Sequence, residues 1–260
     1  MNRPSNTALI TGASSGIGRE LAKIHASKRG NLVLVARSHD KLVALKHELE
    51  AQWGIDAVVI AEDLAASGAA RRIFEQTQAA GIEIDVLINN AGFGGHGLFH
   101  EQRSDDFQAM MQVNMSALTE LTHLYLKGMV QRRRGRILNV SSTASFMPGP
   151  LQAVYYATKA YVTSFTQAVA EEVAVFGITA TALCPGAVAT GFVEAGKLEG
   201  VDLWSEISFL LGFQEPNSFI RAYQAWTGVS PGSLRMQLQR PVVAAAMRET
   251  SRNSTGFDGN

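Results

Sequence analysis

Six short apolar runs, each the length of a β-strand, recur along the chain with helix-length segments between them. The runs cover Ala8 to Thr11, Asn31 to Ala36, Ala57 to Ala61, Asp85 to Asn89, Arg136 to Val140 and Ile178 to Leu183. Alternation of this kind favours right-handed βαβ crossovers, because a helix must return the chain to the same edge before the next parallel strand can begin. We therefore predict an α/β fold with a doubly wound parallel sheet covered on both faces.

The segments between the runs carry helical patterns of two lengths. Gly16 to Arg29 and Lys41 to Trp53 each show a single apolar face. Asp105 to Arg132 and Ala153 to Phe176 are longer and carry more apolar residues than one buried stripe requires. We expect these two longer helices to pack against a partner subunit.

Charge excludes two classes of partner. The 23 Lys and Arg residues balance the 23 Asp and Glu residues, so no overall field attracts nucleic acid or an anionic membrane. The basic cluster from Arg132 to Arg136 is interpreted as a helix end at Gly135, where cations are favoured by the helix dipole.

The uncharged stretch from Val173 to Val193 is broken by Gly177 and Pro185, so we expect a helix end, a strand and a loop there rather than a membrane span.

Chain length and cysteine content indicate the number of domains, the cellular compartment and whether a metal site is expected. A chain of 260 residues with 46% hydrophobic residues fits one domain, residues 1–260. The first strand-like run begins almost at Met1, which leaves no room for an export signal. Cys184 lies alone in an apolar run, with no metal-ligand spacing, and is interpreted as a buried strand residue. We expect a cytoplasmic protein without a metal site.

A glycine-rich turn, Thr11 to Gly18, follows the first strand and opens the first helix. Gly12 permits a tight turn, Gly16 lets the backbone approach a pyrophosphate, and Gly18 allows close helix packing. The helix N-terminus offers amides and a positive dipole to phosphates. This turn predicts a dinucleotide site, which also includes Ser14, Ser15 and Ile17.

Arg37 follows the second strand, where an NAD site is expected to carry an acid for the ribose hydroxyls. Its planar guanidinium instead suits a 2′-phosphate. We therefore predict NADP as the cofactor, with NAD less favoured; the alternative is an arginine that only solvates the turn.

Two further loops are candidate parts of the same site. Asp63, next to Leu64 after the third strand, could accept a hydrogen bond from the adenine amino group or cap the next helix. Asn90, Ala91 and Gly92 follow the fourth strand, where amides can lock the loop and small residues let a cofactor pass. A role in stabilising the turn alone remains the alternative.

Tyr155 and Lys159 are four residues apart, so on a helix they are neighbours. The ammonium is expected to lower the pKa of the phenol, which suits a general acid for carbonyl reduction or a base in the reverse direction. Tyr156 is the competing phenol, at the poorer spacing. Ser142 ends the fifth strand, where it could orient a carbonyl, with Ser141 as the alternative.

The chain resembles the short-chain dehydrogenase/reductase family in the motifs TGASSGIG, NNAG, NVSS, YYATK and CPGAVAT, in order over residues 6–192. The resemblance implies a single-domain Rossmann-type sheet with strand order 3-2-1-4-5-6-7, assembled into homodimers or homotetramers. It also implies that Ser142 holds the carbonyl, Tyr155 transfers the proton and Lys159 binds the nicotinamide ribose. Asn114, which composition alone assigns to a helix surface, would support a proton-relay water.

The same resemblance implies that the nicotinamide carboxamide is contacted by Pro185, Gly186, Val188 and Thr190. The chain departs from the family pattern after about Gly191, where a seventh strand has no clear counterpart. Residues 191–260 are a candidate substrate lid, because Leu198 to Trp226 is aromatic and aliphatic; ordinary core packing is the alternative.

These observations predict an oxidoreductase that uses NADP(H) to reduce a ketone or aldehyde, or to oxidise the corresponding alcohol. The substrate class would be small carbonyl compounds, including apolar 3-oxoacyl or steroid-like molecules. The alternatives are a dinucleotide-binding regulator without turnover, and a related isomerase or dehydratase.

Overall fold

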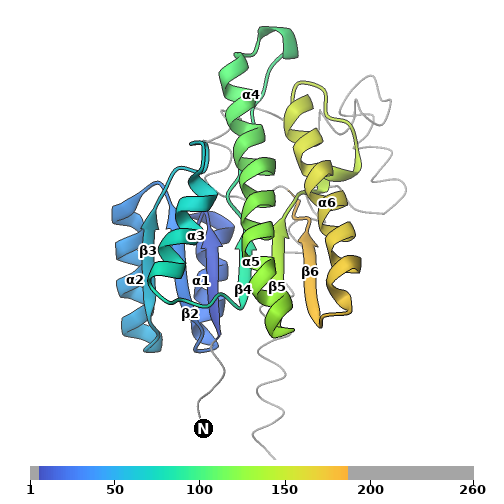
Figure 1. The fold of residues 1–260 in the computed structure, drawn as a ribbon. Helices are drawn as coiled ribbons and strands as arrows, with labels where there is room; N and C mark the ends of the chain where they lie inside the picture. The colour runs from blue at the N-terminus through green and yellow to red at the C-terminus, as the bar shows by residue number, and fades with distance from the viewer. Residues whose placement is uncertain (1–5, 187–260) are drawn as a thin grey trace, which may run out of the picture. The chain divides into compact units, whose positions relative to one another are not determined.

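The computed structural model describes residues 6–186 of the chain. They contain a six-stranded parallel sheet in the order β3-β2-β1-β4-β5-β6 (Figure 1). The strands are β1 (Thr7–Thr11), β2 (Asn31–Ala36), β3 (Ala57–Ala61), β4 (Val86–Asn89), β5 (Gly135–Val140) and β6 (Ile178–Leu183). The predicted order is confirmed for these six strands, and the expected seventh strand lies outside the described residues.

Within residues 6–186, six α-helices connect the strands. They are α1 (Gly16–Ser27), α2 (His39–Trp53), α3 (Ala69–Ala79), α4 (Ser104–Met111), α5 (Leu118–Arg132) and α6 (Ala153–Ala174). Short 3₁₀ turns cover Phe99–Glu101 and Thr143–Phe146. Helix α3 is the one that the apolar pattern did not single out.

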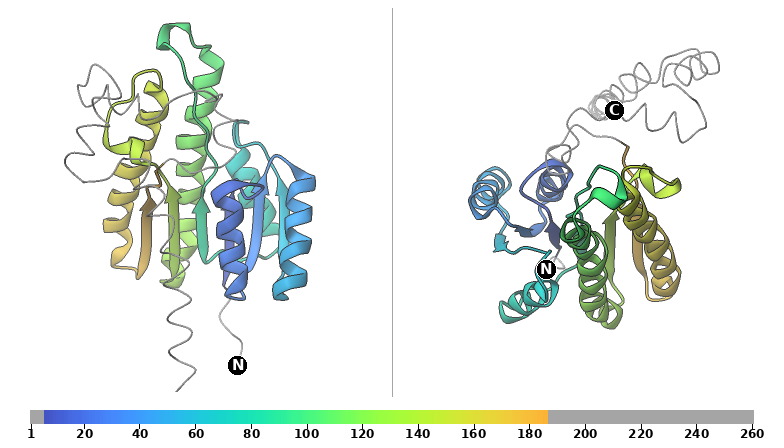
Figure 2. Two further views of the ribbon diagram at one scale, coloured as in Figure 1. Left: turned by 180° about the vertical axis from the view of Figure 1, so that it is seen from behind. Right: turned by 90° about the horizontal axis from the view of Figure 1, so that it is seen from above.

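The helices cover the sheet in two layers, with α1 and α2 on one face and α3, α5 and α6 on the other (Figure 2). Each layer has its own apolar core, because successive side chains of a strand point to opposite faces. In β1, Leu9 packs in the core shared with α3, α5 and α6, and Ile10 packs in the core shared with α1 and α2. The nearly continuous apolar strands thus follow from burial on both faces.

The helix expected from Asp105 to Arg132 is interrupted. A π-helical segment, Gln112–Ala117, joins α4 to α5. Such a wide turn displaces side chains from regular α-helical positions and is often found at functional sites. Asn114 lies in this segment.

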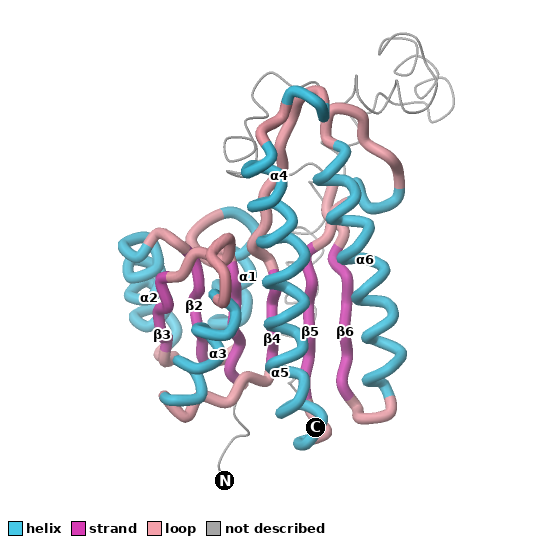
Figure 3. Tube along the Cα trace, turned by 45° about the horizontal axis from the view of Figure 1, so that its top comes forward, coloured by secondary structure: helices cyan, strands magenta, loops and turns pink. Residues whose placement is uncertain are grey.

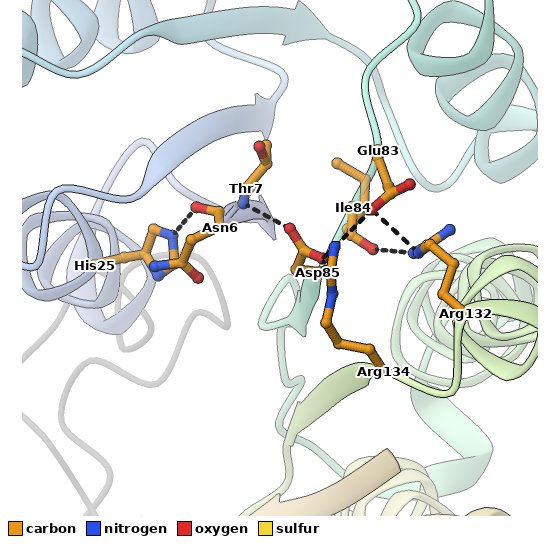
Figure 4. A network of polar contacts seen from close by, with 8 residues as sticks. All are labelled: Asn6, Thr7, His25, Glu83, Ile84, Asp85, Arg132 and Arg134. Atoms are coloured by element: carbon orange, nitrogen blue, oxygen red, sulfur yellow. Dashed lines mark hydrogen bonds and ion pairs between the residues drawn. The ribbon is translucent and has the colours of Figure 1, made fainter. Parts of the chain in front are cut away.

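The amino end of the sheet is held by a polar network (Figure 4). Asp85, which is buried, accepts a hydrogen bond from the backbone N–H of Thr7 at 3.2 Å and pairs with Arg134 at 2.9 Å. Glu83 pairs with Arg134 at 2.8 Å and with Arg132 at 3.1 Å. These contacts tie β1, β4 and the start of β5 together at the edge opposite to the glycine-rich turn.

This network adds ion pairs to the expected role of the basic cluster. Helix α5 ends at Arg132, as expected, with this cation in its last turn, but Gly135 begins β5 instead of ending the helix. Arg132 and Arg134 bind carboxylates, and only Arg133 binds a carbonyl next to a helix end, that of Val175 at 2.7 Å. Two of these cations thus form ion pairs with carboxylates, and Arg132 does so from the end of α5 where the helix dipole also favours a cation.

Cys184 was expected to be a buried strand residue, and this is wrong in detail. It lies one position beyond the end of β6 and is only partly buried. The strand ends before it because the register of β6 with β5 stops at Leu183, opposite Val140.

Candidate active site at the carboxyl edge of the sheet

The candidate residues gather along one edge of the sheet because all six strands run in the same direction. Figure 3 shows the loops that leave the carboxyl ends of the strands along this edge. The glycine-rich turn follows β1, Asn90 follows β4, Ser142 follows β5, and Pro185 follows β6. In open parallel sheets, ligands bind at this edge.

The glycine-rich turn has the backbone that its sequence predicts. Gly12 and Gly16 have φ values of +65° and +55°, which only glycine adopts readily. A Cβ at Gly18 would lie 2.4 Å from the Gly12 carbonyl oxygen, so α1 packs directly on the turn. Ser15 precedes α1 and makes no side-chain cap, and the first turn of α1 contains no acidic residue. Its free amides therefore suit an anion.

The loop after β4 is locked to this turn by the side chain of Asn90, as the sequence analysis predicted. Its Nδ2 donates to the carbonyls of Thr11 and Gly12 at 2.9 and 3.2 Å. The Thr11 hydroxyl in turn accepts hydrogen bonds from the N–H groups of Asn90 and Ala91, both at 3.0 Å. Thr11 is a positioning residue that sequence reasoning missed, although it begins the glycine motif.

Arg37 lies just beyond β2 and is exposed. The N–H of Ala13 donates to the Val35 carbonyl at 3.2 Å, which holds the glycine-rich turn against the end of β2. Within residues 6–186, no acidic side chain forms an ion pair with the Arg37 guanidinium. Arg37 thus offers a positive charge beside the turn.

Asp63 and Leu64 have different surroundings. Asp63 is exposed, and its Oδ1 accepts a hydrogen bond from the N–H of Ala65 at 3.0 Å. It therefore closes its own turn rather than capping α3, which begins at Ala69. Leu64 is buried in the apolar core, so only its backbone can contribute to a ligand site.

Tyr155 and Lys159 lie on α6 and are both buried. The Tyr155 side chain is hydrogen-bonded to that of Ser142. The Lys159 Nζ donates to the Val140 carbonyl at 2.9 Å and lies 5.8 Å from the centre of the Tyr155 ring. A phenol, a hydroxyl and an amine thus meet at the ends of β5 and α6.

The pKa values at this site correct one expectation. Burial raises the pKa of Tyr155, the hydrogen bond from Ser142 opposes this rise, and the neighbouring Tyr156 adds to it. The expected lowering of this pKa by Lys159 is not found, because burial of the phenol is the dominant effect. Burial also lowers the pKa of Lys159 from 10.5 to about 8.

The structure distinguishes Ser142 from Ser141, and Tyr155 from Tyr156. Ser141 is buried, and its hydroxyl is bonded to the Lys159 carbonyl at 2.9 Å and to Thr163 at 2.7 Å. Ser142 is less buried and touches Tyr155. The ring of Tyr156 packs on Gly149, where a Cβ would lie 2.3 Å from it. Ser142 and Tyr155 are therefore the pair in contact.

Asn114 is not on a helix surface, contrary to what composition indicated. It is 1% exposed, and its amide pairs with both backbone groups of Phe93: Nδ2 donates to the carbonyl at 3.0 Å and Oδ1 accepts from the N–H at 3.1 Å. A Cβ at Gly92 would lie 3.0 Å from the Asn114 Oδ1 and 3.3 Å from the Lys159 Nζ. Asn114 and Lys159 therefore border the same glycine.

Of the residues expected to contact nicotinamide, Pro185 and Gly186 are described. The Pro185 carbonyl accepts a hydrogen bond from the N–H of Thr143 at 3.0 Å, which places it beside the residue that follows Ser142. Val188 and Thr190 lie outside the described residues. Within residues 6–186, no helix is long and apolar enough to cross a membrane.

Comparison with known proteins gives consistent matches. The family model described as short chain dehydrogenase matches residues 6–198. The chain is 33% identical over 194 residues to the very-long-chain 3-oxoacyl-CoA reductase of Rattus norvegicus, covering 73% of this chain and 62% of that protein. It is 35% identical over 193 residues to human 17-beta-hydroxysteroid dehydrogenase type 3, covering 72% and 60%.

Among solved structures, a short-chain dehydrogenase from Sphingobium yanoikuyae in complex with NADPH matches with a TM-score of 0.70 and 28% identity, over 98% of both chains. The chain spans only about three fifths of the length of the two curated relatives.

Proposed function

The chain belongs to the short chain dehydrogenase family, and from this premise we propose that it is an NADP(H)-dependent oxidoreductase. It would reduce a ketone or aldehyde, or oxidise the corresponding secondary alcohol. The observation that carries the proposal is the contact between Ser142 and Tyr155, with Lys159 beside them, at the edge that also holds the glycine-rich turn.

The residues fit a dinucleotide. Gly12 and Gly16 carry no side chains, the Ser15 side chain does not cap α1, and the first turn of α1 contains no acidic residue. The glycine-rich turn and α1 would hold the pyrophosphate, and Lys159 the nicotinamide ribose. Bound NADPH would supply the hydride.

The protein groups would handle the proton. Ser142 and Tyr155 would donate hydrogen bonds to the substrate carbonyl oxygen. Because burial raises the pKa of Tyr155, its hydroxyl keeps a proton at neutral pH and can give it to that oxygen as negative charge develops. In the oxidative direction the same phenol would receive the proton of the alcohol.

The test is consumption of NADPH with a panel of ketones and aldehydes, followed at the nicotinamide absorbance. We expect Tyr155→Phe to lower kcat by about 10² to 10⁴-fold, the contribution typical of a general acid. Tyr156→Phe is the matched control and should retain activity. Binding of NADPH by the wild type without turnover on any substrate would favour a dinucleotide-binding regulator instead, and product formation without net NADPH consumption would favour an isomerase or dehydratase.

Preference for NADPH over NADH is proposed from Arg37, whose exposed guanidinium lies beside the glycine-rich turn. Loss of one charge-assisted contact corresponds to about 10 to 100-fold in affinity. We expect Arg37→Ala to raise the KM for NADPH by this factor and to leave the KM for NADH unchanged. Arg71→Ala, at an exposed position on α3, is the control. Equal efficiency of the wild type with both cofactors would refute the assignment.

An apolar substrate, of the 3-oxoacyl or steroid type, is supported by two observations. The names of the two curated relatives refer to such molecules. In addition, the N–H of Gly97 donates to the Leu151 carbonyl at 2.9 Å, which joins the two loops. These loops and the 3₁₀ turns next to them expose four large apolar side chains: Leu98, Phe99, Phe146 and Met147. A panel graded by chain length should show kcat/KM rising with apolar size; a fall would contradict this substrate class.

Assembly and location complete the proposal. A homodimer or homotetramer through α5 and α6 is supported by the partly exposed Tyr161 and Phe165, whose rings stack at 5.8 Å on α6. Light scattering after size exclusion would measure the oligomeric state, and a monomer would contradict this assembly.

A reducing, cytoplasmic location is supported by the single cysteine and would be tested by fractionation.

A further inference from the structure

We propose that Thr158 is a positioning residue for the reaction, acting through Asn114. Thr158 lies between Tyr155 and Lys159 on α6, and the proposed reaction does not use it. Its hydroxyl connects the side chain of Asn114 in the π-helical segment with the first turn of α6. The inference rests on the proposed oxidoreductase function.

The contact geometry around the Thr158 hydroxyl is complete. Its Oγ1 donates its proton to the Tyr155 carbonyl at 2.7 Å, three residues earlier in α6. The same oxygen accepts a hydrogen bond from the Asn114 Nδ2 at 3.0 Å. Thr158 is 1% exposed, so water does not compete for these bonds. The hydroxyl therefore acts as a fixed connection between two segments that are 44 residues apart.

This connection completes the hydrogen bonding of the Asn114 amide group. Nδ2 has two protons, one of which goes to the Phe93 carbonyl and the other to Thr158, while Oδ1 accepts from the N–H of Phe93. With both donors used, the amide plane cannot rotate or flip without breaking a buried hydrogen bond. Only Oδ1 keeps a spare acceptor position.

The orientation of that oxygen matters because of what lies next to it. The Asn114 Oδ1 and the Lys159 Nζ both border the α-carbon of Gly92, and Lys159 follows Thr158 directly in the chain. Thr158 thus joins the backbone that bears the phenol to the asparagine amide, and the next residue in the helix carries the amine. A displacement of Asn114 would disturb the polar surroundings of Lys159 without removing any group of the proposed site.

Helix α6 provides a matched control two turns further along. The Thr166 hydroxyl donates to the Val162 carbonyl at 2.6 Å and accepts from the Asn139 Nδ2 at 2.9 Å. Thr166 is also 1% exposed. It therefore shares the chemistry, burial and helix of Thr158 but serves an asparagine on β5, away from Tyr155 and Lys159. Substitution by valine keeps the shape of both side chains and removes only the hydroxyl.

The test compares Thr158→Val with Thr166→Val in the full chain. We expect the two substitutions to lower the thermal unfolding temperature to a similar extent, because each leaves one buried amide proton without a partner. Only Thr158→Val should lower kcat, by about tenfold or more, with little change in the KM of substrate. Thr158→Ser, which keeps the hydroxyl, should restore kcat, and Thr158→Ala replaces the valine variant if that variant does not fold.

A double-mutant cycle identifies the route of the effect. If Thr158 acts through Asn114, adding Thr158→Val to Asn114→Ala should lower kcat no further than Asn114→Ala alone. Independent, multiplicative losses would overturn the proposal, as would wild-type kcat in Thr158→Val or equal losses of kcat in the two valine variants.

A readout without turnover separates this inference from the proposed function. Solvent exchange of the Asn114 side-chain protons, followed by NMR, should accelerate in Thr158→Val and stay slow in Thr166→Val. If the wild type reduces no carbonyl compound, the proposed function fails, and with it the role in the reaction. If the Asn114 side-chain protons exchange equally slowly in Thr158→Val, Thr158 does not fix the Asn114 amide, and the inference fails even if the enzyme is active.

Discussion

Lys159→Met should make the protein more stable at neutral pH while abolishing its activity. Lys159 is buried, and burial lowers its pKa from 10.5 to about 8. At about 1.4 kcal/mol for each pKa unit, keeping the charged amine in the folded protein costs about 3 kcal/mol. The methionine removes this cost but leaves the Val140 carbonyl without the amine, at about 1 to 2 kcal/mol. A net gain of about 1 to 2 kcal/mol at pH 7 remains.

The sign of the pH dependence follows from linkage. Between the folded pKa of about 8 and the unfolded pKa of about 10.4, the unfolded chain binds the proton that the folded chain has released. The free energy of unfolding of the wild type therefore rises with pH, by about 2 kcal/mol between pH 7 and pH 9.5 from this lysine alone. Lys159→Met lacks this rise, so its advantage should vanish by pH 9.5.

The assay is urea denaturation of both proteins at pH 7 and pH 9.5, followed by circular dichroism. The range stops below pH 10 because burial raises the pKa of Tyr155 and raises that of Tyr125 to about 12, so unfolding releases tyrosine protons at higher pH. Lys127→Met, at an exposed position on α5, should show the pH dependence of the wild type. A Lys159→Met protein that is less stable than the wild type at pH 7, or a difference that does not change with pH, would refute the reasoning.

Three further substitutions test other parts of the structure. Asp85→Ala should lower the free energy of unfolding by about 2 to 3 kcal/mol, because it leaves the buried N–H of Thr7 unpaired, and should leave kcat unchanged; denaturation with parallel kinetics checks this. Gly18→Ala should abolish NADPH binding in a fluorescence titration, since its Cβ would lie 2.4 Å from the Gly12 carbonyl oxygen. Ser142→Ala removes the hydrogen bond that lowers the pKa of Tyr155, so kcat should fall and the alkaline limb of the pH–rate profile should move upward; an unshifted limb would contradict this contact.

The strands were the most predictable part of the fold. Three of them, Asn31–Ala36, Ala57–Ala61 and Ile178–Leu183, begin and end at the predicted residues. Buried parallel strands are short apolar runs between turn residues, and this composition is local. Helix α3 was not singled out, and the expected helix from Asp105 to Arg132 concealed a π-helical segment. The π-helical segment has no distinct local composition, whereas α3 buries Ala70, Ile73 and Thr77 on one face, a local pattern that could have revealed it.

The sequence by itself determined the edge of the sheet at which the site lies and the chemical groups available there. Glycine spacing determines a turn, and the spacing of Tyr155 and Lys159 determines a shared helix face, because both depend only on local backbone geometry. The choice between Ser141 and Ser142 was left open by the residues alone.

Tertiary structure decided that choice, the burial of Asn114 and the direction of the pKa of Tyr155. Each depends on groups far away in the chain: Thr158 lies 44 residues from Asn114, and Asn90 lies 78 residues from the Gly12 carbonyl that it binds. Desolvation likewise depends on every segment packed around a group, and it is the largest cause of the raised pKa of Tyr155. Local spacing therefore indicates which groups can meet, and packing sets their partners and their protons.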